Sequence, residues 1–451
     1  WQPFGGSQTL SIAGNNLTIS GVGGNTVALP LGGTSPFERD AINGDVQPVS
    51  SIVTIGSDNF VFGSQQLDNA GGTTDDNRFF FNKGKGSFRA GSASAVQWDN
   101  GSVGTFSFAA GLNNTATNQA STAFGENNNA TARFSTAMGI SSNATGESSF
   151  AIGNTARAQG NSSMALGHTA NAQGDYSFAT GYQTNATAVG AFVGGYQNNA
   201  TSPNSFAFGY QSAASAAQAV AFGEQTRAQG SNSFTAGFMT IASAQNSTAF
   251  GQSTFSSGTN AFAAGYQTSA TGQYSVALGQ QTLSSGTNAL TAGYINTASG
   301  QYSVAFGQNN TSSSPNSFTM GLQNTASGQY AVAFGQNNIS SGANTFTMGY
   351  QNTAIGQYAV GLGQNNQAIG GNSLVMGFNN IASAASSYSV VFGQRNTANG
   401  ANGFVTGDNS VVIGTSAFAS GASVTATGVY SASIGANNDA AGAQSVAMSF
   451  G

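Results

Sequence analysis

Glycine returns every fourteen residues through the middle of this sequence. Spacing this regular is not typical of a globular enzyme, whose core needs elements of unequal length. It is typical of one short unit stacked on copies of itself, each contacting mainly its neighbours. The sequence therefore predicts a solenoid. Twenty glycines keep the register without a shift, namely Gly111, Gly125, Gly139, Gly153, Gly167, Gly181, Gly195, Gly209, Gly223, Gly237, Gly251, Gly265, Gly279, Gly293, Gly307, Gly321, Gly335, Gly349, Gly363 and Gly377.

Large apolar residues alternate with small ones just before each register glycine, as in 206–208 (Phe-Ala-Phe) and 304–306 (Val-Ala-Phe). A period of two is typical of a β-strand, and the frequent glycines and turn-forming residues argue against a helix. Seven residues after the register glycine comes a second turn position, which is often glycine, as at Gly272 and Gly300. We therefore predict two short strands and two tight turns in each coil, with glycine supplying turn dihedrals that a side chain would forbid.

Stacked coils of this kind pair through parallel strands at a spacing of about 4.8 Å, so twenty coils would form a rod roughly 95 Å long. A coil of fourteen residues is thin, and we expect it to turn only two or three large side chains inward. The remaining apolar surface needs another partner. Identical copies around a rotation axis along the rod would bury it, which predicts a homo-oligomer.

Three pentapeptides in this register carry a family resemblance: 149–153 (Ser-Phe-Ala-Ile-Gly), 275–279 (Ser-Val-Ala-Leu-Gly) and 303–307 (Ser-Val-Ala-Phe-Gly). They resemble the head repeats of YadA-like trimeric autotransporter adhesins, and similar repeats occur in bacterial and phage fibre proteins. The resemblance implies a left-handed parallel β-roll three chains wide. It also implies surface attachment as the role and an extracellular or cell-surface location.

A second period, twice as long as the first, modulates the repeat. Tyr274, Tyr302, Tyr330 and Tyr358 alternate with asparagine at the matching position of the coils between them. Large residues beside small ones let neighbouring layers interdigitate. One explanation is duplication of a two-coil cassette. The rival is a wider solenoid in which one turn takes both units of the cassette, and which could hold its core as a monomer. We favour the trimer of fourteen-residue coils.

Three regions are predicted along the chain. Residues 1–105 carry 13 of the 23 charged residues and several hairpin signals, which predict an N-terminal β-strand and hairpin region that caps or docks the solenoid. Residues 106–393 form the head-repeat solenoid, with a bulged loop where Ala384-Ala385-Ser386-Ser387 add two residues. Beyond Gly407 the glycines come every seven residues, which predicts irregular distal repeats or a tip over 394–451.

Composition excludes several classes of function. Charged residues are only 5% of the chain, and the net charge of −5 argues against nucleic-acid binding. Cysteine is absent and His168 is the single histidine, so neither a zinc site nor a Ser-His-Asp relay is expected. We expect His168 to be a solvated repeat residue. We predict no enzyme activity, no cofactor and no metal, and no apolar run reaches membrane-spanning length.

The leading hypothesis is a non-enzymatic extracellular fibre that acts as an adhesin, with a host surface, a glycan or a neighbouring cell as its partner. A second hypothesis is a subunit that polymerises end to end into an extracellular filament, with Trp1 and Phe4 as candidate assembly residues. A third is a phage tail-fibre receptor-binding protein. The first residue, Trp1 in place of methionine, predicts a chain processed on export.

Overall fold

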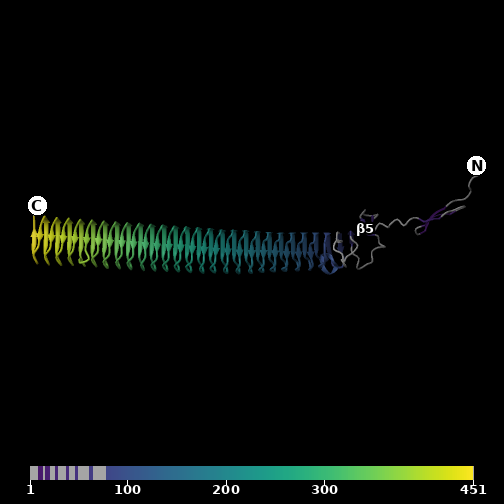
Figure 1. Cartoon of the computed structure of the whole chain (residues 1–451), viewed down its shortest axis with the longest axis horizontal. Helices are drawn as coiled ribbons and strands as arrows, with labels where there is room; N and C mark the ends of the chain where they lie inside the picture. The colour runs from purple at the N-terminus through teal and green to yellow at the C-terminus, as the bar shows by residue number, and fades with distance from the viewer. Residues whose placement is uncertain are drawn as a thin grey trace, which may run out of the picture.

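The computed structural model describes residues 78–449 continuously, and before them only six strands. These strands are β1 (Thr9–Ala13), β2 (Asn16–Ser20), β3 (Thr26–Ala28), β4 (Phe37–Arg39), β5 (Val46–Pro48) and β6 (Phe60–Gly63). The continuous part is a straight rod of stacked coils that runs to the C-terminal end (Figure 1). No α-helix occurs among the described residues, so none of them forms a helix able to cross a membrane.

The predicted hairpins near the N-terminus are present. β1 pairs antiparallel with β2, and β2 with β3. β4 and β5 form a second antiparallel pair, which the sequence analysis missed. A third meander joins β6 to β7 (Arg78–Asn82) and β7 to β8 (Ser87–Ser92). The boundary of an N-terminal region at residue 105 stays a prediction.

Each coil contains one long and one short strand. The long strands run from β9 (Phe108–Leu112) through β11 (Thr122–Glu126) and onward every fourteen residues to β47 (Leu374–Phe378). They end with β49 (Val390–Gln394), β51 (Phe404–Asp408), β53 (Phe418–Ala422), β55 (Ala432–Ala436) and β57 (Val446–Met448). The short strands, from β10 (Thr115–Ala116) to β56 (Asp439–Ala440), each begin three residues after the long strand before them and form a 24-stranded sheet.

Every long strand pairs in parallel with the next one in sequence, so that Gly335 lies beside Gly349 and Gly349 beside Gly363. One turn of the solenoid therefore takes fourteen residues, and the alternative of a turn twice as long is wrong. Parallel strands about 4.8 Å apart give 25 long strands a length of roughly 115 Å.

The two additional residues predicted near 384–387 form a widened turn, and the register of the sheets is unchanged. All five residue pairs between β47 and β49, such as Leu374 with Val390, are sixteen residues apart, whereas the pairs between β49 and β51 return to the spacing of fourteen. Beyond this turn the same coil continues through β57. The glycines spaced by seven in 394–451 are the register glycine and the second turn glycine of ordinary coils, so the predicted irregular repeats are wrong there. The domain limits themselves stay predictions.

Small side chains fill the interior of the coil. The alanine between the two large residues of a long strand is buried, as at Ala151 and Ala305, whereas Phe150 and Ile152 face outward. Within the described coils the largest fully buried side chain is valine. The expectation of two or three large inward residues is therefore wrong. A turn of fourteen residues encloses too little space for Phe or Leu, so these residues lie on the outside of the chain's own coil.

Two residues per coil take a left-handed backbone conformation, and they are rarely glycine. Asn309 (φ 55°) and Tyr302 (φ 56°) represent the two positions, which lie seven residues apart. The register glycine has φ between 105° and 145°, so glycine supplies that dihedral as predicted. At the second turn the prediction is wrong, because Gly272 has no positive φ. Glycine is favoured there because a Cβ on Gly272 would lie 2.1 Å from the carbonyl oxygen of Gly286 in the next coil, although Ala188 and Ser202 stand at the same position in other coils.

The first coil is joined to a packed segment built from larger side chains. β8 pairs in parallel with β9, which places Arg89 beside Ala109 at the inward position. Fully buried, the Arg89 guanidinium donates to the carbonyl oxygens of Phe88, Ser107 and Ala116 and to the Ser107 hydroxyl. Trp98, in the 3-10 helix η1 (Val96–Trp98), is also fully buried, and its Nε1 donates to the carbonyl oxygen of Asn114 at 2.9 Å. These side chains cover the end of the narrow interior.

Candidate functional site

The outward surface of the long-strand sheet carries the most continuous apolar feature of the rod. We call this surface the assembly face, and it consists of the residues three and one positions before each register glycine and the residue after it. Its side chains include Phe124 (53% exposed), Phe222 (50%), Met320 (47%) and Met348 (48%). Scattered apolar residues are normal on a protein surface, but a contiguous strip running the length of the rod marks an interaction site.

Aromatic rings on the assembly face stack from coil to coil. Phe178, Phe192 and Phe206 lie with ring centroids 4.7 and 4.8 Å apart and interplanar angles of 11° and 4°. Later in the rod, Phe306, Phe318 and Phe334 meet edge to face at 6.0 and 5.1 Å. Both arrangements are favourable for aromatic pairs. The parallel register therefore turns a repeated residue type into an ordered column.

A second aromatic column follows the register glycine. Tyr182, Tyr196 and Tyr210 stack at 4.9 and 5.0 Å with interplanar angles of 6°, and His168 stacks on Tyr182 at 4.9 Å. Beside it runs a ladder of glutamine amides on the same coils, in which Gln197 donates to Gln183 at 2.8 Å and Gln211 donates to Gln197 at 2.9 Å. The residues 182, 196 and 210 lie at the edge of the assembly face.

His168 is exposed, as predicted, and its Nδ1 lies 2.7 Å from the Thr169 hydroxyl. No acidic residue is hydrogen-bonded to this imidazole among the described residues. Within residues 78–449 there is also no group of three His, Cys, Asp or Glu side chains that could hold a metal ion.

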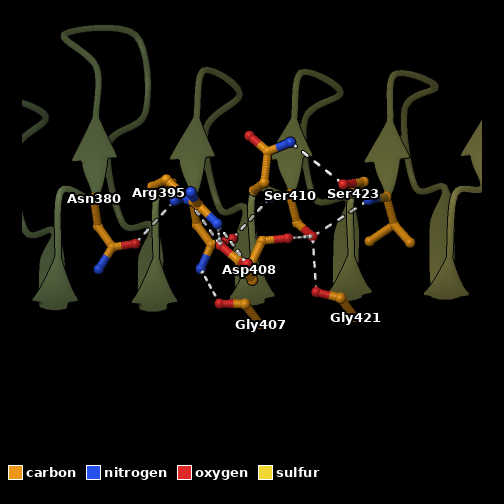
Figure 2. Close-up of polar contacts among 10 residues, drawn as sticks. Asn380, Arg395, Gly407, Asp408, Ser410, Gly421 and Ser423 are labelled. Carbon is orange, nitrogen blue, oxygen red and sulfur yellow. Dashed lines mark hydrogen bonds and ion pairs between the residues drawn. The ribbon is translucent and has the colours of Figure 1, made fainter.

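One exposed ion pair links neighbouring coils just after the widened turn. Arg395 donates from Nε and Nη2 to the carboxylate of Asp408 at 2.7–3.0 Å (Figure 2). The hydrogen bond to Asp408, together with its negative charge, raises the pKa of Arg395. Inside the coil at the same level, Asn380 Oδ1 accepts a hydrogen bond from the amide of Asn396 at 2.9 Å. The Asn380–Asn396 hydrogen bond thus joins the coils on both sides of the widened turn, and the ion pair joins the two coils that follow it.

The long uncharged stretch of the rod was not singled out from the sequence. Between Arg227 and Arg395 there is no Asp, Glu, Lys, Arg or His. Surface polarity in this stretch comes from amides and hydroxyls alone. Electrostatic attraction, which guides most binding of nucleic acids and anionic polymers, has no charged side chain to act through there.

The structure places all twenty predicted register glycines side by side along the long-strand sheet, each with a positive φ. A Cβ on Gly335 would collide with the carbonyl oxygen of Gly349, and the other register glycines meet the next coil in the same way. Their role is structural. Trp1 and Phe4, the candidate assembly residues, lie outside the described residues.

Sequence reasoning missed the buried asparagines. Eight of them form a continuous internal column three residues after the register glycine: Asn296, Asn310, Asn324, Asn338, Asn352, Asn366, Asn380 and Asn396. The side-chain oxygens of the first seven accept from the backbone amide of the asparagine in the next coil, as in Asn324 to Asn310 at 2.9 Å, and that of Asn396 accepts from the amide of Ser410. The invariant position of asparagine in these coils was a usable signal, but asparagine is so common in the chain that the column was not distinguished.

These features define a class of protein, a parallel β-solenoid fibre whose coil is too narrow to bury its own large side chains. The chain belongs to the family of YadA head domain repeats. The model of that family matches residues 116–142, 130–156, 158–184, 195–212, 214–234, 242–268, 270–294, 298–318, 326–352, 354–380 and 406–431, which together are more than half of the chain. No curated protein matches the chain in sequence.

Proposed function

We propose that this chain forms the rod of an extracellular, non-enzymatic adhesin, assembled as a homotrimer and displayed at a cell surface. The observation that carries this proposal is the assembly face. A sheet surface bearing Phe222, Met320 and Met348 at about half exposure is costly to leave in water. Three copies that turn these faces toward a common axis would bury them. Membership in the YadA head family supports three as the number of copies.

The role in attachment follows from the shape and surface of the rod together with the family. A rigid rod roughly 115 Å long holds its outer surfaces away from the cell that carries it. The opposite sheet, made of two-residue strands, presents polar side chains such as Asn129 and Asn143, whose amides hydrogen-bond to each other at 2.9 Å. Repeated polar surfaces of this kind suit multivalent contact with another surface.

The native mass of the purified chain tests the assembly, measured by light scattering across a hundredfold range of protein concentration. A mass of three chains at all concentrations supports the proposal, and a folded monomer contradicts it. Attachment is tested separately, with beads coated by the protein and scored for retention on cells and on abiotic surfaces. Trimers that retain no beads would leave a structural fibre and overturn the adhesin role.

A further inference from the structure

The turn that precedes each long strand carries a regular series of exposed tyrosines. Tyr274, Tyr302, Tyr330 and Tyr358, which we call the tyrosine array, are 51–53% exposed, and their spacing is twice the period of the coil. Because one coil takes fourteen residues, the tyrosines lie on every second coil, at intervals of about 10 Å along the rod. Their nearly equal exposure indicates that each ring has the same position relative to its coil.

The side chains of these tyrosines do not stabilise the coil that carries them. All four have φ between 56° and 61°, a left-handed conformation that disfavours a bulky side chain. The coils between them place asparagine at the same position, at Asn288, Asn316 and Asn344, and asparagine adopts this conformation at lower cost. The tyrosine side chains make no hydrogen bond or ring contact within residues 78–449. The fold sets this conformation in every coil, so what needs a reason is the choice of tyrosine over asparagine; a bulky side chain there without a local contact fits a residue kept for binding.

A free amide accompanies each ring of the array. The residue before each tyrosine is an exposed glutamine, at Gln273, Gln301, Gln329 and Gln357. Their side chains make no hydrogen bond within the described residues, so donors and acceptors both point to solvent. The intervening coils carry Thr287, Pro315 and Ala343 at this position. Larger Gln-Tyr pairs and smaller pairs therefore alternate along one edge of the rod.

We propose that the tyrosine array binds an extended, neutral, β-linked polysaccharide that lies along the rod. Aromatic rings pack against the apolar faces of pyranose rings, and amides exchange hydrogen bonds with sugar hydroxyls. An extended β-linked chain presents an equivalent sugar face at every second residue, which matches a site that repeats on every second coil. The absence of charged residues between Arg227 and Arg395 excludes recognition through ionic contacts and favours a neutral polymer.

This inference names a ligand for the proposed adhesin and so rests on that function. The test uses the full chain and measures its retention on insoluble amorphous cellulose, with starch granules and an alginate gel as α-linked and anionic comparisons. We expect retention on cellulose that does not change between 50 mM and 1 M salt, and weak retention on the other two. Retention on all three alike, or on none, overturns the proposal.

The decisive variant replaces all four tyrosines with the residue of the intervening coils, as Tyr274→Asn, Tyr302→Asn, Tyr330→Asn and Tyr358→Asn. Because asparagine suits the left-handed turn, we expect an unchanged or slightly higher melting temperature. Binding to cellulose should weaken by about tenfold or more, as when aromatic anchors are removed from an interface. The matched control is Tyr176→Asn with Tyr430→Asn, two exposed tyrosines at the same turn position outside the array, and it should bind as the unchanged chain does.

Two other outcomes contradict the polysaccharide site in distinguishable ways. If the fourfold variant melts earlier or loses its trimeric mass, the tyrosines join protomers. If the unchanged chain does not bind cellulose but forms side-by-side bundles that the variant does not form, the tyrosine array mediates contacts between rods. If the trimer attaches cells to surfaces but does not bind cellulose, the proposed ligand is wrong and the proposed adhesin function is unaffected.

Discussion

Asn338 donates from its side-chain amide to Oδ1 of Asn324 at 3.1 Å, and both side chains are fully buried. The same Nδ2 also lies within hydrogen-bond distance of the carbonyl oxygens of Phe334, at 2.8 Å, and Gly349, at 2.7 Å. Its oxygen in turn accepts from the backbone and side-chain amides of Asn352. One side chain thus ties together three consecutive coils in an interior that has no large apolar residue.

Replacing this asparagine should therefore destabilise the rod. Asn338→Ala leaves the backbone amide of Asn352 and the carbonyl oxygen of Gly349 without this side-chain partner in a buried interior, and we expect a loss of about 3 kcal/mol in the free energy of unfolding. Thermal unfolding followed by circular dichroism measures it. The exposed Ser341→Ala in the next turn is the control and should change little. An equal effect of the two substitutions would show that the column does not stabilise the rod.

The register glycine should not tolerate even a methyl group. Gly335 has φ of 111°, and a Cβ there would collide with the carbonyl oxygen of Gly349, so Gly335→Ala should lower stability by about 3 kcal/mol or more. Gly371 has no positive φ, and its nearest contact would be 3.7 Å away. Gly371→Ala should therefore be nearly neutral. Denaturant unfolding of the two variants in parallel tests this, and a tolerated alanine at 335 would disprove the close approach of the coils.

Polar substitutions on the assembly face should weaken association and leave the coil intact. Met320→Gln with Met348→Gln keeps side-chain length but removes apolar surface, and the concentration at which the assembly dissociates should rise by about tenfold or more. Light scattering at decreasing concentration measures it, while circular dichroism reports the β-structure. Thr325→Gln with Thr353→Gln, on the opposite sheet, is the matched control because Gln367 occupies the same position naturally. A control variant that dissociates equally would place the interface elsewhere.

Arg89 should make stability depend on pH in the alkaline range. Burial lowers the pKa of its guanidinium from its ordinary value to about 10. Below pH 10 the group is charged in both the folded and the unfolded state, so its contribution is constant. Above pH 10 the folded chain releases the proton while the unfolded chain still retains it, so the free energy of unfolding should rise with pH.

The measurement compares the unchanged chain with Arg89→Met, in which the titration is absent. Between pH 9 and pH 11, the free energy of unfolding of the unchanged chain should rise by about 1.4 kcal/mol relative to that of Arg89→Met. All other side chains are the same in both proteins, so their contributions cancel in the comparison. A difference that stays constant, or that moves in the opposite direction, would mean that the guanidinium remains charged in the folded state.

The period of fourteen predicted the coil, the strands and the direction of the rod, because each of these follows from repetition alone. It did not predict which face of a long strand points inward, since alternation between Phe150 and Ala151 is the same read from either side. The volume enclosed by fourteen residues decides that question in favour of alanine. The left-handed turns were hidden for another reason. Tyr302 and Asn309 share a backbone conformation but no chemistry, and only the coordinates show what they have in common.

The hydrogen bonds between coils all point along the rod, and this has a mechanical consequence. A pull on one end is shared among every bond of a layer at once, so the load does not fall on a single strand that could peel away. The widened turn at 384–387 does not interrupt this chain of bonds, because β47 and β49 remain fully paired across it. A tether built in this way keeps its length under tension until an entire layer separates.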